Sequence, residues 1–359
     1  MKLGIYLTGA FGQSQELNKA RNEAKRGRGP YEAVDRQVAK DTKAIVDAQQ
    51  RLGFNFISDP MFRVDYLFQP FAERVPRVGY NSNDRAARLL SKFRADFARR
   101  LHKDKNVREG PQENWFDNNL FYTRPVISGN LETNSGGFTS RYLNLDLLTG
   151  GDKIAFLPSP YTLMALSIYG NSNGYELPSG IQQRLIKGIA QVILNEARDL
   201  AAKGFTRIQF DEPEIARRQS LGALTRTDLT LLDMALQICG KVEGAKTVLH
   251  TYFGNSGPIL GNLKEMNVDG IGIDATETSL DSMLSQNFDG KELAVGLVDA
   301  RIEIKEEPKK LAEKLERIAD KTKSSGLFLV PNTGTELIGY THGLEKMATL
   351  SAAKELFGK

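Results

Sequence analysis

The stretch that decides the fold is Gly204-Phe-Thr-Arg-Ile-Gln-Phe-Asp-Glu-Pro213, in which an apolar strand runs directly into two adjacent carboxylates. Pro213 ends the predicted strand, because proline has no N–H to donate to a sheet ladder. Two acids at the end of a buried strand are destabilising unless they are paired or bind a ligand. Asp211 and Glu212 are therefore candidate binding residues, and the alternative is that they cap the helix that follows the strand.

Similar apolar runs, each bounded by turn residues, recur along the chain and predict a series of strands. The eight predicted strands cover residues 3–7, 54–57, 154–157, 207–210, 247–249, 270–273, 293–297 and 327–330. Amphipathic stretches between them predict helices, for example at 31–52, 180–203, 228–242 and 308–324. This alternation predicts an α/β fold, a (β/α)8 TIM barrel, as a single domain over residues 1–359. A doubly wound sheet is the alternative, although no G-x-G-x-x-G follows the first strand.

A long gap separates the second and third predicted strands. It covers about residues 60–150 and predicts a helical insertion, with its helix around 85–104. An aromatic segment follows within the same insertion, running from Trp115 to Tyr122.

The composition is that of an ordinary soluble globular protein, with 40% hydrophobic and 26% charged residues. The net charge of +4 comes from 48 basic and 44 acidic residues, which is too weak a bias to predict a nucleic-acid partner. The chain shows no signal peptide and no stretch of about 18 apolar residues, so we expect a cytoplasmic protein without a membrane partner. Cys239 is the single cysteine, which excludes an intrachain disulfide.

A barrel of this kind places its ligand site at the C-terminal ends of the strands. Nearly every predicted strand end in this chain carries a carboxylate, an amide, a hydroxyl or an imidazole. The candidate substrate-binding residues there are Asp59, Asp211, Glu212, Tyr252, Asp274 and Asn332, with His250 among them. We expect a small-molecule site at this face, with Asp211 and His250 as candidates for acid–base catalysis.

Four motifs resemble those of the cobalamin-independent methionine synthase family, whose enzymes consist of two related barrels. Ile208-Gln-Phe-Asp-Glu-Pro213 resembles the family's strand-end Q-x-D-E-P, and Trp115-Phe-Asp-Asn-Asn119 resembles its W-F-D-T-N. Ser159-Pro-Tyr-Thr162 is similar to its G-P-x-T, and Gly12 with Glu16-Leu-Asn-Lys-Ala20 is similar to its G-x-x-R-E-L-K-K-A. The resemblance implies methyl transfer without cobalamin in methionine biosynthesis. It also implies substrate contacts by Trp115, Asp117 and Asn118.

The catalytic barrel of that family holds zinc through His-x-Cys, a glutamate and a later cysteine, and the zinc activates the homocysteine thiol. In this chain Tyr252 stands at the first cysteine position and Thr333 at the second. A zinc ion held by His250 with Asp274 or Glu277 is the remaining possibility, because imidazole and carboxylate are competent ligands. That set lacks the soft thiolates of a thiol-activating site.

The zinc-free N-terminal half of the family resembles this chain more than the catalytic half does. The segment Thr251-Tyr-Phe253 is similar to its T-T-Y-F, and residues 268–274 and 294–298 are similar to its sixth and seventh strands. In the family this half covers the methyl-donor site and helps to hold the polyglutamate tail of the folate. Lys19 matches one lysine of that tail-binding motif, whereas Asn18 replaces another.

Three functions are compatible with these patterns. In the first, the chain is the N-terminal-type subunit of a split 5-methyltetrahydropteroyltriglutamate–homocysteine methyltransferase, which docks on a zinc-bearing catalytic barrel and assists folate binding. In the second, it is a stand-alone methyltransferase of the same superfamily, in which Asp211 and Glu212 bind a substrate amino group. In the third, it is a barrel that binds a methyl-folate or an amino acid without catalysis.

Overall fold

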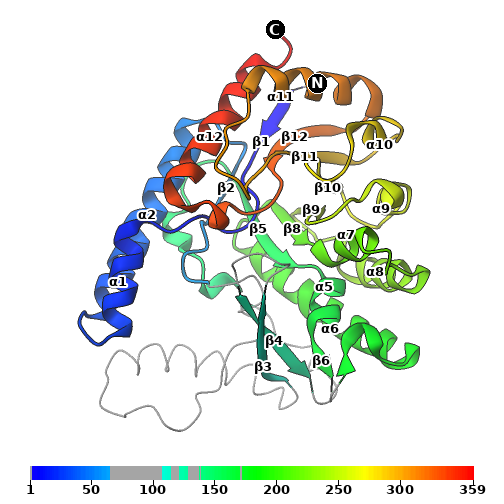
Figure 1. Cartoon of the computed structure of the whole chain (residues 1–359), viewed down its shortest axis with the longest axis horizontal. Coiled ribbons are helices and arrows are strands. Elements are labelled where there is room, and N and C mark those ends of the chain that lie inside the picture. The colour runs from blue at the N-terminus through cyan, green and yellow to red at the C-terminus, as the bar shows by residue number, and fades with distance from the viewer. Residues whose placement is uncertain (1, 65–106, 115–120, 128–136, 138, 170–171) are drawn as a thin grey trace.

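The computed structural model describes residues 2–64, 107–114, 121–127, 137, 139–169 and 172–359. All eight predicted strands are present and form one parallel sheet in the order β1-β12-β11-β10-β9-β8-β5-β2 (Figure 1). Their bounds are β1 Leu3–Ile5, β2 Phe56–Ser58, β5 Asp152–Pro158, β8 Arg207–Asp211, β9 Lys246–Thr251, β10 Gly270–Asp274, β11 Glu292–Val298 and β12 Gly326–Pro331. The predicted barrel is confirmed as a nearly closed one.

The two ends of the sheet, β1 and β2, meet through single hydrogen bonds instead of a ladder. The Asn55 N–H donates to the Ile5 carbonyl at 2.9 Å. The Ile5 N–H in turn donates to the Asn55 side-chain Oδ1, also at 2.9 Å. The residue before β2 therefore closes the ring that the strand pairing leaves open.

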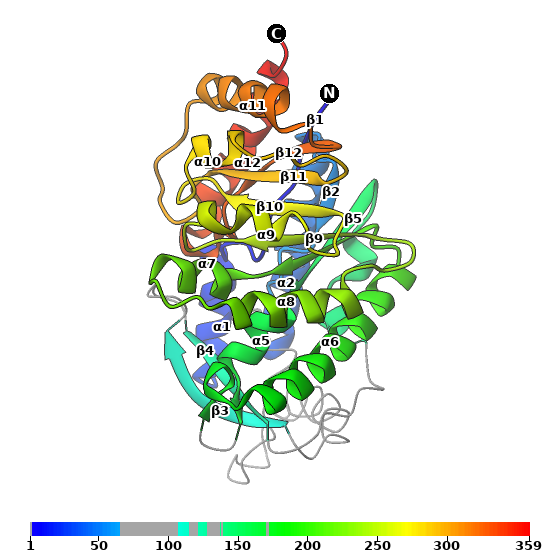
Figure 2. The ribbon, with the colours of Figure 1, turned by 90° about the vertical axis from the view of Figure 1, so that its right-hand side faces the viewer.

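The helices cover the outside of this ring, and α6 and α8 pack side by side along it (Figure 2). The four named helix predictions are confirmed to within three residues by α2 Tyr31–Arg51, α6 Ser179–Ala202, α8 Arg226–Cys239 and α11 Pro308–Thr322. The other helices of the described residues are α1 Gln15–Lys25, α5 Pro160–Leu166, α7 Pro213–Ser220, α9 Leu260–Leu263, α10 Leu280–Leu284 and α12 Gly339–Leu356. Short 3-10 turns lie at Thr139–Arg141, Leu145–Leu147, Gly174–Glu176, Gly257–Ile259 and Thr335–Leu337. Among the described residues, no helix combines the length and apolarity that a membrane span requires.

The described part of the predicted insertion contains a β-hairpin, which the sequence analysis missed. Strands β3 (Val107–Asn114) and β4 (Phe121–Ile127) pair antiparallel, and β6 (Ile168–Tyr169) and β7 (Ser172–Asn173) complete a second sheet. The helix expected around 85–104 lies outside the described residues. The hairpin depends on distant partners, since the Arg124 Nε of β4 donates to the Leu166 carbonyl at the end of α5 at 2.8 Å.

The N-terminal end of the barrel interior is closed by an arginine among aromatic rings. Arg207 is 1% exposed, and its guanidinium carbon lies 4.3 Å from the ring centre of Phe56 and 4.5 Å from that of Phe328. The guanidinium also pairs with the Glu292 carboxylate. This packing fills one end of the barrel, so polar strand ends are available for a ligand at the other end.

Candidate functional site

One buried carboxyl, Asp211, and one partly buried carboxyl, Glu336, lie at the C-terminal mouth of the barrel. Asp211 ends β8 and is 3% exposed, and Gln209 Nε2 donates to its Oδ1 at 2.7 Å. Burial raises the pKa of Asp211 to about 8 against the effect of that hydrogen bond, and the neighbouring charges of Glu336 and Glu212 add to the rise. Burial likewise raises the pKa of Glu336, which follows β12, to about 7. Near neutral pH Asp211 is therefore mostly protonated and Glu336 is protonated in part, and an incoming positive charge would displace these protons.

The atoms around these carboxyls are hydrogen-bond acceptors with unused capacity. Within the described part of the chain, the Gln209 Oε1, the Glu336 Oε2 and the His250 Nδ1 are buried without a hydrogen-bond partner. Burial, together with the charges of Asp211 and Glu336, raises the pKa of the Tyr252 hydroxyl, so the phenol stays protonated. We call Gln209, Asp211, Tyr252 and Glu336 the mouth cluster. Its free acceptors fit a ligand that donates N–H groups.

Glu212, the neighbour of Asp211, is engaged in helix capping. Its Oε1 accepts from the Thr162 hydroxyl at 2.6 Å and from the Ile215 N–H at 3.0 Å. Its Oε2 accepts from the Thr162 N–H at 3.2 Å. One carboxylate thus accepts from an N–H group in the first turn of both α5 and α7. The alternative that the two acids cap a helix therefore holds for Glu212 and not for Asp211. A substrate contact by Glu212 stays a prediction.

Asp59, at the end of β2, also has both oxygens occupied. Its Oδ1 accepts from the Met61 N–H at 2.7 Å, and its Oδ2 accepts from the Asn144 N–H at 2.7 Å and from the Asn144 amide at 3.1 Å. These bonds join the loop after β2 to the segment before β5. The arrangement fixes two loops at the rim, and a binding role for Asp59 remains a prediction.

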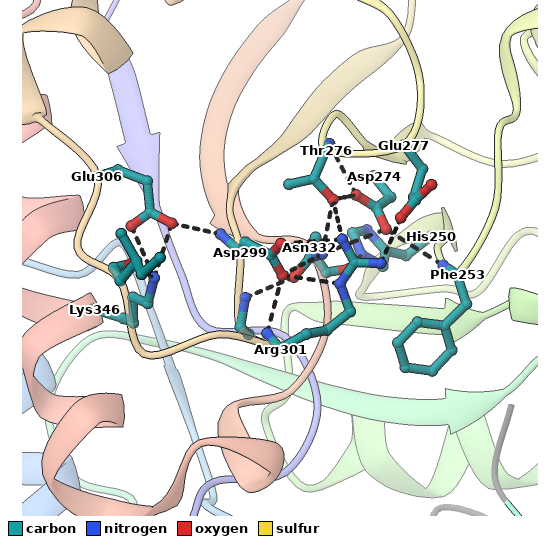
Figure 3. A network of polar contacts seen from close by, with 12 residues as sticks. His250, Phe253, Asp274, Thr276, Glu277, Asp299, Arg301, Glu306, Asn332 and Lys346 are labelled. Atoms are coloured by element: carbon teal, nitrogen blue, oxygen red, sulfur yellow. Dashed lines mark hydrogen bonds and ion pairs between the residues drawn. The ribbon is translucent and has the colours of Figure 1, made fainter. Parts of the chain in front are cut away.

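His250, on β9, is held as a neutral imidazole (Figure 3). Its Nε2 donates to the Asn332 carbonyl at 2.8 Å, which leaves Nδ1 as the acceptor. Burial lowers the pKa of His250 to about 4. The ring lies against Gly272 of β10, where a Cβ would come within 2.0 Å of Nδ1. Only glycine leaves room for this imidazole.

The side chains of Asn332 and Asp274 belong to the polar network of Figure 3. The Asn332 amide donates to Asp274 Oδ2 at 3.4 Å and to Asp299 Oδ1 at 3.2 Å, and its Oδ1 accepts from the Ala300 N–H at 2.9 Å. Asp274 Oδ1 accepts from the Thr276 hydroxyl at 2.6 Å. Both residues therefore hold the loops after β10 and β11 in place.

The three candidate metal ligands, His250, Asp274 and Glu277, do not converge on a metal position. The Nε2 of His250 is committed to a carbonyl, both oxygens of Asp274 accept hydrogen bonds, and Glu277 pairs with Arg301. In the described ranges, no group of three or more His, Cys, Asp or Glu residues is arranged to hold a metal ion. The Thr333 carbonyl accepts from the Thr8 hydroxyl at 2.8 Å. These donors do not fit zinc, and no chemical step through a metal follows from them.

The other predicted binding residues lie apart from the mouth cluster. Lys19 is exposed on α1, which projects from the barrel, and it lines an open hollow with Gln15, Asn18, Asn22, Glu23, Arg26 and Arg28 (Figure 1). Trp115, Asp117 and Asn118 lie outside the described residues. A folate-tail role for Lys19 and the three insertion contacts stay predictions.

Two members of the mouth cluster, Gln209 and Glu336, were missed by the sequence analysis. Gln209 could have been found, because residues two apart on a strand face the same side and Asp211 was already a candidate. Glu336 gave no comparable signal, since it lies beyond a strand end in a 3-10 turn. Only the path of the chain after β12 brings it close enough to Asp211 for their charges to interact.

The fold is a (β/α)8 barrel in which polar side chains gather at the C-terminal ends of the strands. A family model described as "Cobalamin-independent synthase, N-terminal domain" matches residues 74–323. The chain belongs to this family and is a methionine-synthase-related barrel, which confirms the resemblance to the N-terminal half.

Two relatives show how much of a full-length enzyme this chain resembles. One from Bifidobacterium animalis subsp. lactis is 28% identical over 171 residues, covering 46% of this chain and 21% of the relative. One from Bifidobacterium longum is 24% identical over 277 residues, covering 74% of this chain and 34% of the relative. Both are named 5-methyltetrahydropteroyltriglutamate–homocysteine methyltransferase. The chain thus matches about a third or less of these relatives' length.

Solved structures show the same fold at full coverage. A B12-independent methionine synthase from Shewanella sp. W3-18-1 has a TM-score of 0.64 and 17% identity, with 99% of this chain and 97% of that chain covered. A putative vitamin-B12-independent methionine synthase from Listeria monocytogenes has a TM-score of 0.65 and 14% identity, with 100% of both chains covered.

Proposed function

We propose that this barrel binds a small substrate of methionine-synthase-type methyl transfer and works with a zinc-bearing partner barrel. The supporting observation is the contrast between two sets of side chains at the barrel mouth. The mouth cluster has buried acceptors without a hydrogen-bond partner among the described residues, whereas the side chains that would hold a metal are bonded to other protein groups. Thiol activation would therefore belong to the partner subunit.

The chemistry of the mouth cluster supports a ligand with N–H donors. The Glu336 Oε2 and the Gln209 Oε1 lack partners among the described residues, and Asp211 is close enough to feel the Glu336 charge. The ammonium group of an amino acid or the amine edge of a pterin offers matching donors. The Tyr252 ring, 5.6 Å from the His250 ring, adds an aromatic face beside these acceptors. The names of the relatives contain both a pteroyl compound and an amino acid.

Two groups at the mouth differ in what they can do with a proton. With a pKa of about 8, Asp211 can exchange a proton with a ligand nitrogen near neutral pH. With a pKa of about 4, His250 stays neutral and offers a lone pair on Nδ1. Asp211 is thus the better candidate for acid–base work, and His250 is suited to accepting a hydrogen bond.

Calorimetric titration with the methylated folate and with homocysteine tests the binding role. We expect the wild type to bind one of them, and we expect Asp211→Asn and Glu336→Gln to weaken that binding at least tenfold. Glu313→Gln, on the exposed face of α11, is the matched control and should bind like the wild type. Full affinity in both mouth variants would contradict the assignment of the site.

A stand-alone methyltransferase is the second candidate, and the single-barrel relatives favour it. The Shewanella protein was solved in complex with selenomethionine, and 97% of that chain is covered. Homocysteine methylation by the purified chain without a partner would establish this alternative. Binding without turnover, even beside a zinc-bearing barrel of the family, would instead indicate a non-catalytic binding barrel.

A further inference from the structure

Arg301, in the loop after β11, spans two neighbouring strand ends (Figure 3). Its Nε donates to Asp299 Oδ1 at 2.9 Å and its Nη2 to Asp299 Oδ2 at 3.0 Å. Its Nη1 donates to Glu277 Oε1 at 2.5 Å, and its Nη2 also donates to the Thr276 hydroxyl at 2.9 Å. One guanidinium therefore contacts the loops that follow β10 and β11.

The carboxylates of Asp274, Glu277 and Asp299 lie at these two strand ends. Without a positive group among them their negative charges would repel one another. Asp299 receives two parallel bonds from Arg301, the geometry in which guanidinium and carboxylate interact most strongly. Asp274 is fully buried and is joined to Asp299 through the Asn332 amide. Arg301 and Asp299 are 29% and 17% exposed, so removing the guanidinium leaves negative charge that water screens only in part, which is destabilising.

We propose that Arg301 takes the place of a metal ion at the strand ends of this barrel. Its fixed charge pairs directly with Asp299 and Glu277 and offsets part of the negative charge that these two acids and Asp274 bring together. Its planar fork holds the loops after β10 and β11 in one arrangement. Two of these acids are the carboxylates considered above as zinc ligands. A guanidinium keeps its charge at every accessible pH, and a chelator does not remove it. Arg301 organises the charge of this face whatever ligand the mouth cluster binds.

Chemical rescue of an arginine deletion tests this role. We expect Arg301→Ala to lower the melting temperature by roughly 4 °C or more, because it leaves the acids unpaired. Millimolar guanidinium chloride or millimolar Mg²⁺ should restore part of that loss, since either cation can enter the vacated position. Arg317→Ala, on the exposed face of α11, is the matched control and should neither lose stability nor respond to these cations.

Two further measurements cover the case in which Arg301→Ala does not fold. Arg301→Lys retains the charge without the fork, and we expect it to fold and to melt below the wild type. The purified wild type should contain no stoichiometric zinc, and its melting temperature should not respond to EDTA.

Three results would overturn the proposal. The first is one equivalent of zinc in the wild type that disappears in Glu277→Gln. The second is an Arg301→Ala or Arg301→Lys variant as stable as the wild type. The third is a loss of stability in Arg301→Ala that no cation restores, because it would show a packing role in place of a charge role.

Discussion

Replacing Asp211 by asparagine should make the protein more stable at alkaline pH and remove part of its pH dependence. In the unfolded chain this carboxyl loses its proton near its ordinary pKa of about 3.9, whereas in the folded protein it does so near pH 8. Between these values the unfolded state binds fewer protons than the folded state. The free energy of unfolding must therefore fall as the pH rises through this window, and level off above it.

The size of the effect follows from the position of Asp211. A carboxyl pKa raised from about 3.9 to about 8 corresponds to about 5 kcal/mol of lost stability at pH 8 and above. Rearrangement and water entry around a buried charge relieve part of this, so we expect a measured gain of at least about 2 kcal/mol in Asp211→Asn. The asparagine Oδ1 can still accept from Gln209 Nε2, so the hydrogen bond is kept.

Urea-induced unfolding between pH 5 and pH 9 measures this difference. The advantage of Asp211→Asn over the wild type should be smallest at pH 5 and grow towards pH 8. Glu313→Gln should follow the wild type, because that side chain is exposed. Glu212→Ala should instead lose about 2 to 4 kcal/mol, because it leaves the N–H groups of Thr162 and Ile215 without their acceptor. A constant difference between wild type and Asp211→Asn over this pH range would refute the reasoning.

Three further predictions concern the core. Gly272→Ala should destabilise the barrel by about 3 kcal/mol, because the new methyl group would meet the His250 imidazole 2.0 Å away; an unchanged melting temperature would contradict this. Arg207→Ala should cost about 3 to 5 kcal/mol, because it strips the buried Glu292 carboxylate of a partner, whereas Arg207→Met should cost less. Urea titration of both variants checks the order. Cys239 should resist thiol reagents in the native protein, because burial raises its pKa to about 12; modification faster than unfolding would show that the thiol is accessible.

The strands and the main helices were predictable because their signals are local. Short apolar runs between turn residues identified every strand of the barrel, and a first-turn proline marked the start of α11. The β3–β4 hairpin was not predictable in this way. It pairs with β6, which follows β4 by about 40 residues, and Arg124 ties it to the carbonyl at the end of α5. The hydrophobic pattern of a strand does not show which distant segment the strand pairs with.

The sequence predicted where the candidate site lies but not which residues form it. The acids after β8 indicated a polar mouth, but the two adjacent carboxyls looked equivalent in the sequence. The structure separates them, because Glu212 turns to the N-termini of α5 and α7 while Asp211 stays at the mouth. Glu336 enters the same cluster from the far end of the chain. Arg301 likewise pairs with acids from two loops.

The sequence by itself determined the barrel, its family and the face on which a ligand site lies, because periodicity, turn residues and strand-end motifs are properties of neighbouring residues. Only the tertiary structure decided which acids cap helices, which retain free acceptors and what balances the buried charge. Those outcomes depend on side chains separated by tens to hundreds of residues, such as His250 and Asn332, and on how far each is removed from water. Burial and long-range pairing set the pKa of each group, so the chemistry of the mouth follows from the fold.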